Sequence, residues 1–200
     1  MPRYKKKKFR ARVLLRRIIF FALIGFVLFW GIEQTPVFQR FIYPYPYRTL
    51  IEKYAYSSGL DPLLVVSVMR EESKFLPRSE SPKGAVGLMQ LMPSTAQAIA
   101  KGLGDTDYND EDLVNPEKNI QYGTWYLADL KKEFNDPVLI LAAYNGGRGR
   151  VKEWLDNKQI NPSQVRQQDI PYEETRQYVE RVLKSYQKYS KLYPAEVIEN

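Results

Sequence analysis

Hydrophobic residues between positions 47 and 192 recur at the spacing of α-helices, without the sustained alternation that strands show. Pro follows Asp or Asn at residues 61–62, 115–116 and 136–137, a pairing that favours a helix N-cap with Pro in the first turn. Helices are therefore predicted over residues 47–58, 62–75, 94–101, 116–134, 137–145, 150–157 and 172–192, with Ser94 as the capping residue of the third. These helices predict an all-α domain.

The N-terminal segment has a different pattern. Residues 18–32 form an uncharged run, IIFFALIGFVLFWGI, which follows the basic pair Arg16-Arg17. As a helix, these fifteen residues would span about 22 Å, less than the roughly 30 Å of a bilayer core, although residues 13–15 extend the apolar stretch. The run is predicted to be a transmembrane anchor. A cleaved signal sequence and a buried helix of a soluble protein are the alternatives, but no small-x-small cleavage site follows the run.

The basic residues are concentrated at the same end of the chain. Residues 1–32 carry nine of the 30 Lys and Arg residues and no acidic residue, which leaves 21 basic against 23 acidic side chains in residues 33–200. The formal net charge of +7 therefore belongs to the N-terminal segment, and no nucleic-acid partner is expected for the rest of the chain. Positive charges before an anchor predict that the N-terminus stays on the cytoplasmic side of the membrane and that the rest of the chain lies on the outer side.

These features predict four regions. Residues 1–17 form a basic cytoplasmic tail, and residues 18–32 form a single-pass anchor or a signal sequence. Residues 33–47 contain three Pro and no helical period, so they are predicted to be a stiff, non-helical linker. Residues 48–200 form the all-α domain.

The chain has no Cys and no His. Disulfides, thiol nucleophiles and Ser-His or Cys-His catalytic systems are therefore excluded, and a catalytic zinc site is not expected. Carboxylates, Lys and Tyr remain for acid–base chemistry, and we expect neither a metal nor a cofactor.

Glu72 is the strongest candidate for such chemistry. On a helical wheel it lies within about 60° of Val65, Val68 and Met69, whereas Glu71 lies at the edge of the polar face. A carboxyl group among apolar side chains should have a raised pKa, which would let it donate a proton at neutral pH. The alternative is a glutamate at a helix end that reaches solvent or pairs with Arg.

Three further segments carry candidate binding residues: SPKGAVGLMQLMPSTAQ (residues 81–97), AAYNGG (142–147) and IPYEETRQYV (170–179). The first offers glycines for close backbone approach, the amide of Gln90, and Met89 and Met92 to pack on a sugar face. Each segment also has a structural explanation: turns, core methionines, a helix C-cap, and a surface pair of Glu174 and Arg176.

Together with ES-x-F after residue 71 and NP-x-x-NI-x-x-G-x-x-YL from residue 115, these segments resemble the soluble-lytic-transglycosylase catalytic domain over about residues 48–188. The resemblance implies a lysozyme-like α-helical fold that cleaves the β-1,4 bond between N-acetylmuramic acid and N-acetylglucosamine in peptidoglycan. It implies that Glu72 is the catalytic acid. It also implies glycan contacts from Ser81, Gln90, Met92, Thr95, Ala143, Tyr144, Asn145 and Glu174, with Tyr144 near the reacting sugar and Glu174 supporting the site from the last helix.

The reaction implied by the family uses one carboxyl group twice and leaves a 1,6-anhydromuramoyl end. Outside Glu72, no segment supplies an obvious second carboxylate, although Asp61, Asp105 or Glu174 could approach in space. A goose-type lysozyme-like hydrolase of the same bond is the first alternative. A non-catalytic wall-binding scaffold is the second.

Overall fold

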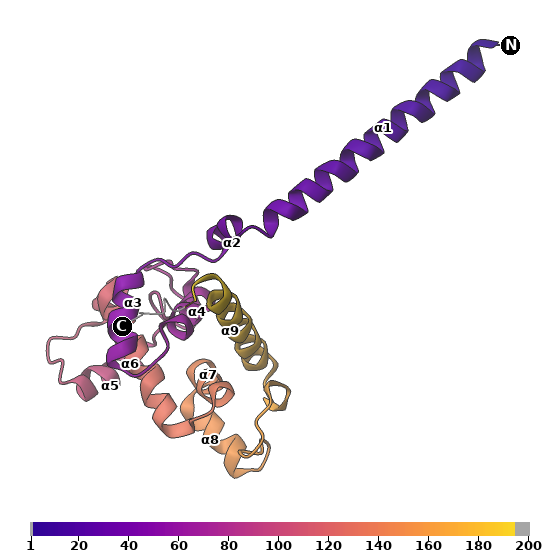
Figure 1. The fold of residues 1–200 in the computed structure, drawn as a ribbon. Helices are drawn as coiled ribbons and strands as arrows, with labels where there is room; N and C mark the ends of the chain where they lie inside the picture. Colours follow the sequence, from indigo (N-terminus) through magenta and orange to yellow (C-terminus); the bar gives the residue numbers. More distant parts are fainter. Residues whose placement is uncertain (1, 195–200) are drawn as a thin grey trace, which may run out of the picture. The chain divides into compact units, whose positions relative to one another are not determined.

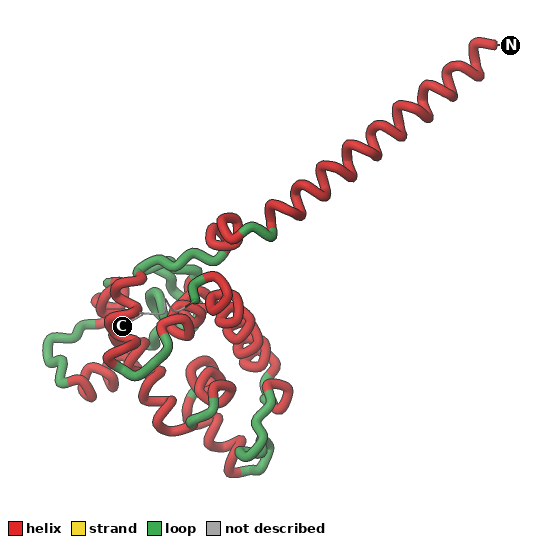
Figure 2. The backbone as a smooth tube through the Cα atoms, in the orientation of Figure 1, coloured by secondary structure: helices red, strands yellow, loops and turns green. Residues whose placement is uncertain are grey.

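The computed structural model describes residues 2–194, and the chain divides into two compact units, residues 1–44 and 45–200 (Figure 1). Helices and loops account for the described part of the chain, in which no strand occurs and only isolated bridges link residues 80, 86 and 91 (Figure 2). The predicted all-α class is therefore confirmed.

The first unit consists of α1 (Pro2–Glu33) and α2 (Pro36–Ile42). The basic segment and the uncharged run thus belong to one continuous helix. Among the residues described, no single helix is long and apolar enough to cross a membrane; Arg16–Gly31 and Pro36–Ile42 reach that length and composition only as a pair, with a bend of 74° between them.

Helix α2 corrects one prediction. Residues 33–47 were expected to lack helix, but Thr35 caps a short helix there by accepting a hydrogen bond from the Phe38 N–H at 3.3 Å. Pro36 occupies the first helical position, where its fixed φ angle suits a helix and its missing N–H costs nothing. A helix of seven residues is too short to show a hydrophobic period, which is why the pattern did not reveal it.

The second unit contains seven α-helices and two short 3₁₀ helices within its described residues. They are α3 (Arg48–Ser57), α4 (Pro62–Ser73), α5 (Pro93–Leu103), η1 (Asp110–Val114), α6 (Pro116–Phe134), α7 (Pro137–Gly146), α8 (Arg148–Asp156), η2 (Gln167–Asp169) and α9 (Glu173–Leu192).

The three predicted Asx-Pro caps are confirmed. Asp61, Asn115 and Asp136 each accept a hydrogen bond at 2.8–2.9 Å from the backbone N–H two residues later. Ser94 is not a cap: α5 begins one residue earlier, at Pro93, after an N-cap residue that gives no side-chain hydrogen bond. Helix starts that are set by local side-chain chemistry are thus predicted best.

Helix α7 lies at the centre of this unit. Its residues 139–143 are all buried, and it packs against α6, α8 and α9. Helix α4 packs along α9 and also contacts α3. Burial of each large apolar side chain in these contacts contributes about 1.5–3 kcal/mol, so the core fixes how α4, α7 and α9 lie relative to one another.

Candidate active site

Glu72 lies in the last turn of α4. The helix ends at Ser73 because Lys74 and Phe75 both have positive φ angles, 51° and 67°. The predicted extension to residue 75 is therefore wrong, and the chain turns away directly after Glu72. The Ser73 hydroxyl donates a hydrogen bond to the Leu88 carbonyl at 2.8 Å, which ties this helix end to the loop that follows.

Burial raises the pKa of Glu72 to about 7, with a smaller contribution from the neighbouring Glu71 charge. The Tyr178 hydroxyl and the Arg181 charge, both on α9, act in the opposite direction without cancelling the rise. This is the direction that the helical wheel predicts. At neutral pH, a substantial fraction of Glu72 is therefore protonated and able to act as an acid.

Two tyrosines face Glu72 from other helices. Burial and then the Glu72 charge raise the pKa of both Tyr144, on α7, and Tyr178, on α9, well above the usual value. The Tyr144 hydroxyl donates to the Met89 carbonyl at 2.8 Å. The Tyr178 hydroxyl is buried and makes no hydrogen bond of normal length and angle within the described chain. Both phenols therefore stay neutral beside the carboxyl group.

The loop after α4 is held by Asn119 of α6. Its side chain accepts a hydrogen bond from the Met89 N–H at 2.7 Å and donates to the Val86 carbonyl at 3.0 Å. Gly87 has a φ angle of +86°, and a Cβ there would lie 2.2 Å from the Asn119 amide nitrogen. Gly84 also has a positive φ but no atom within 4 Å, so it serves the turn alone. The expected close approach of backbone is confirmed at Gly87 only.

Met89 does not face a sugar. It is fully buried, and a Cβ at Gly123 of α6 would lie 2.4 Å from its sulfur. The expectation that Met89 packs on a glycan is therefore wrong, because it fills the space that a glycine leaves on α6. Met92 keeps 39% of its surface exposed and remains available to a ligand.

The predicted glycan contacts differ in accessibility. Asn145, at the end of α7, is exposed, and Ser81 is half-buried and accepts a hydrogen bond from the Ala85 N–H at 3.0 Å. Gln90 donates through its amide nitrogen to the carbonyls of residues 79 and 87 at 3.0 and 2.9 Å, so this nitrogen stabilises the loop. Ala143 has no exposed surface. Its contact with a glycan stays a prediction.

The two remaining predicted contacts, Thr95 and Glu174, lie on α5 and α9. Thr95 is half-buried and lines a cavity of about 400 Å³, which is also lined by Trp125 and Tyr126. Tyr126 packs against Tyr144 with ring centroids 5.5 Å apart and ring planes tilted by 45°, so this cavity lies beside one of the tyrosines that face Glu72. Glu174 is in the first turn of α9, is 78% exposed, and lies 3.8 Å from the Lys83 ammonium group instead of pairing with Arg176.

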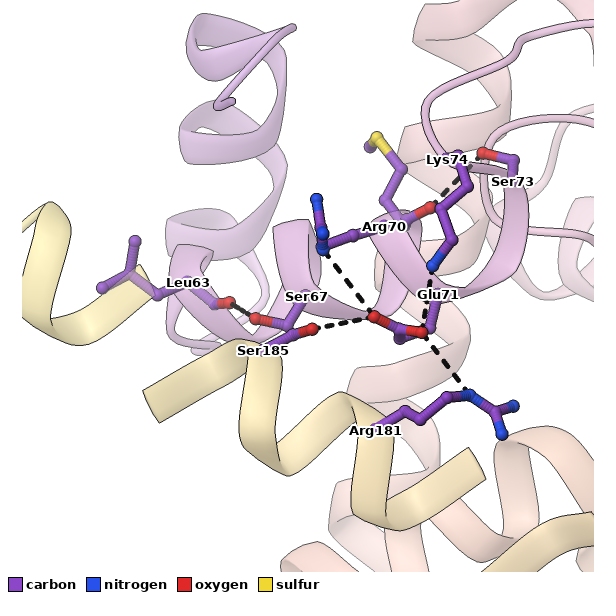
Figure 3. Close-up of polar contacts among 9 residues, drawn as sticks. Leu63, Ser67, Arg70, Glu71, Ser73, Lys74, Arg181 and Ser185 are labelled. Atoms are coloured by element: carbon purple, nitrogen blue, oxygen red, sulfur yellow. Dashed lines mark hydrogen bonds and ion pairs between the residues drawn. The ribbon is translucent and has the colours of Figure 1, made fainter. Parts of the chain in front are cut away.

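Sequence reasoning missed the environment of Glu71. Its side chain is only 7% exposed, not at a polar edge, and it contacts Arg181 and Ser185 of α9 (Figure 3). The sequence analysis also assigned no role to Tyr178. The spacing of Tyr178, Val182 and Ser185 along one buried face of α9 was the available signal. Among the described residues, no group of three or more Asp, Glu, His or Cys side chains is arranged to hold a metal ion.

The described residues thus form an all-α domain in which Glu72, at a helix end, has a raised pKa and is faced by tyrosines from two other helices. Comparison with known proteins identifies the family. The sequence pattern of the Transglycosylase SLT domain matches residues 49–167, and the chain belongs to this family.

Three relatives illustrate the likeness. The soluble lytic murein transglycosylase of Salmonella typhimurium is 38% identical over 144 residues, which are 70% of this chain and 22% of that protein. The membrane-bound lytic murein transglycosylase C of Actinobacillus pleuropneumoniae is 31% identical over 165 residues, which are 72% of this chain and 45% of that protein. The solved lytic transglycosylase Slt of Pseudomonas aeruginosa, an inactive glutamate-to-glutamine mutant, matches with a TM-score of 0.67 and 34% identity over 74% of this chain and 24% of its own.

This chain therefore spans between about a fifth and a half of the length of these relatives. The lysozyme-like fold that the resemblance implied is confirmed.

Proposed function

We propose that this protein is a peptidoglycan lytic transglycosylase and that Glu72 is its catalytic acid and base. The observation that carries the proposal is the placement of Glu72, which is partly buried at the end of α4, has a pKa of about 7 and is faced by Tyr144 and Tyr178. Family membership and relatives that are named lytic murein transglycosylases support it.

The proposed reaction has two proton transfers. Protonated Glu72 gives its proton to the glycosidic oxygen as the bond from the muramoyl anomeric carbon to that oxygen breaks. The Glu72 carboxylate then takes the proton of the muramoyl 6-hydroxyl, whose oxygen bonds to the anomeric carbon and closes a 1,6-anhydro ring. Glu72 ends protonated as it began, and no water is consumed.

The positions of other carboxylates favour this reaction over hydrolysis with two carboxylates. Asp61 caps the opposite end of α4, about 16 Å of helix rise from Glu72, and accepts a hydrogen bond from Tyr186 at 2.6 Å. Asp105 is bound to Lys118 and Tyr122 at 2.5 and 2.6 Å. Retaining and inverting glycosidases need the second carboxyl group roughly 5–9.5 Å from the acid. Asp61 lies beyond that range, and Asp105 is held by a cation and a phenol.

The proposed glycan contacts are the exposed or half-buried residues Ser81, Gln90, Met92, Thr95, Tyr144, Asn145 and Glu174, together with the buried Ala143. Thr95 lines the cavity that α5, α6 and α8 form, Met92 is the residue before α5, and Tyr144 packs against Tyr126 of the cavity wall. These side chains suit apolar contact and hydrogen bonding to sugar rings.

The N-terminal segment is proposed to anchor the enzyme in the bacterial cell membrane, with the catalytic domain on the outer side. Large apolar side chains along α1, such as Phe21, Phe26 and Trp30, are 59–68% exposed. Such a surface suits lipid better than water. A relative named as membrane-bound is consistent with this placement.

Digestion of purified peptidoglycan by the full-length protein in detergent tests the proposal. Mass spectrometry separates anhydro ends from reducing ends, because the anhydro form lacks one water. The wild type should yield anhydro ends, and Glu72→Gln should yield no products above background. A majority of reducing ends would identify a hydrolase, and equal activity of Glu72→Gln would remove Glu72 from the mechanism.

A further inference from the structure

Glu71 is a charged side chain buried between two helices. Its carboxylate accepts a hydrogen bond from the Ser185 hydroxyl at 2.8 Å and lies 3.5 Å from the Arg181 Nε atom, both on α9 (Figure 3). On the α4 side it lies 3.1 Å from the ammonium group of Lys74, the residue that caps the end of α4, and 3.8 Å from the Arg70 Nε atom. A buried carboxylate is costly unless it is paired, so these contacts strongly constrain where α9 can lie against α4.

The same face of α9 carries Tyr178. Tyr178, Val182 and Ser185 are separated by four and three residues, which places them along one side of the helix, and all three are buried. When Ser185 and Arg181 are bound to Glu71, Tyr178 therefore meets the adjacent residue of α4, Glu72. A slide or rotation of α9 would move Tyr178 and Arg181 together.

We propose that Glu71 is a positioning residue for catalysis, which fixes α9 against α4 so that Tyr178 and Arg181 are correctly placed around Glu72. This inference rests on the proposed role of Glu72. Glu71 does not touch the glycan in this scheme. It acts through the helix that it binds and through its own charge.

The charges around Glu72 make the inference measurable. The Glu71 charge raises the pKa of Glu72, whereas the Arg181 charge and the Tyr178 hydroxyl lower it. Tyr144 faces Glu72 from α7 as a neutral phenol. Because Glu72 must be protonated to start the reaction, activity should decline as pH rises through its pKa.

The test is the pH dependence of kcat and kcat/KM for the full-length protein on soluble glycan fragments. Glu71→Gln should move the falling, alkaline limb to lower pH and reduce kcat by roughly tenfold, with KM changed less than about threefold. Arg181→Gln should move the same limb to higher pH. If Glu71 and Arg181 only stabilised the fold, their two variants would not shift the alkaline limb in opposite directions.

Two controls separate charge from packing. Ser185→Ala removes a hydrogen bond from the same network but no charge, so it should lower kcat and move the limb less than Glu71→Gln does. Glu180→Gln changes a solvent-facing glutamate of α9 that pairs with Lys184 and should change neither quantity. Melting temperatures of all variants report whether each one folds.

The inference is overturned if the limbs of Glu71→Gln and Arg181→Gln do not move, or if Ser185→Ala moves its limb as far as Glu71→Gln does. If Glu71→Gln does not fold, an unmoved limb for Arg181→Gln or a wild-type kcat for Ser185→Ala overturns the inference. Glu72→Gln in the same assay tests the proposed function separately. If Glu72→Gln is inactive but the limbs of Glu71→Gln and Arg181→Gln do not move, only the role of Glu71 is rejected.

Discussion

The last turn of α4 holds two adjacent glutamates whose pKa values are shifted in opposite directions. Glu72 faces tyrosines, and burial raises its pKa to about 7. Burial would also raise the pKa of Glu71, but hydrogen bonds from Ser185 and Lys74 and the charges of Lys74 and Arg70 outweigh it, so this pKa is lowered. The comparison shows that burial alone does not decide which carboxyl group is ionised. The partners supplied by the neighbouring helices decide it.

Glu72→Gln should produce the largest effect. A general acid contributes on the order of 10²–10⁴-fold to a rate, so the initial rate of anhydro-end formation should fall by about that factor. Because glutamine has nearly the same shape and no charge, the melting temperature at pH 8 should stay equal or rise. The measurement is the initial rate at which the variant forms anhydro ends, compared with that of wild-type protein at the same concentration. Substantial residual activity would mean that the two glutamates do not differ in role.

The pH dependence of stability should differ between wild type and Glu72→Gln. The folded pKa of Glu72 is about 7, above its ordinary value of 4.5, so the folded state binds the proton more tightly than the unfolded state. The stabilisation of the fold that results from this tighter proton binding is fully present below pH 4.5 and is lost as pH rises through 7. Its upper bound is about 3 kcal/mol.

Denaturant unfolding between pH 4 and pH 8 measures this difference. The free energy of unfolding of the wild type should decline relative to that of Glu72→Gln over this window. Parallel curves for the two proteins would contradict a raised pKa at Glu72.

Glu71→Gln should show the opposite trend in stability. The lowered pKa of Glu71 means that its carboxylate stabilises the fold above its unfolded pKa, and that this stabilisation is lost as pH falls through the folded pKa. The variant should therefore be less stable than wild type at pH 7, by about 2 kcal/mol for hydrogen bonds to a buried charge. The deficit should shrink in acid. A deficit that is constant from pH 7 to pH 3 would indicate a steric cause.

The features that sequence reasoning predicted well are local or follow an ordered motif. Asp61, Asn115 and Asp136 cap their helices because the hydrogen bond closes within two residues of the chain. The motif order led to the family that the chain belongs to, and the wheel placed Glu72 on an apolar face, in agreement with its raised pKa.

The features that it missed depend on distant residues. Glu71 is bound by Ser185, 114 positions along the chain, and no local pattern shows that α9 supplies a hydroxyl and an arginine there. Met89 likewise is core because Gly123 of α6 leaves room for it. A helical wheel separates two faces, but it does not say what each face meets.

Lys74→Gln should give the smallest effect and identifies which contacts hold Glu71. Lys74 lies 3.1 Å from the Glu71 carboxylate, but its side chain is 61% exposed, whereas Ser185 is buried. Exposed ion pairs contribute about 0–1 kcal/mol because water and salt screen them. Removal of this cation should therefore lower the free energy of unfolding by less than about 1 kcal/mol and leave kcat unchanged.

Denaturant unfolding of wild type, Lys74→Gln and Ser185→Ala at low and high salt measures what Lys74 contributes to the free energy of unfolding. A loss larger than that of Ser185→Ala would mean that α4 itself stabilises the Glu71 carboxylate. The contrast between the two glutamates would then arise within one helix, and α9 would not be needed to explain it.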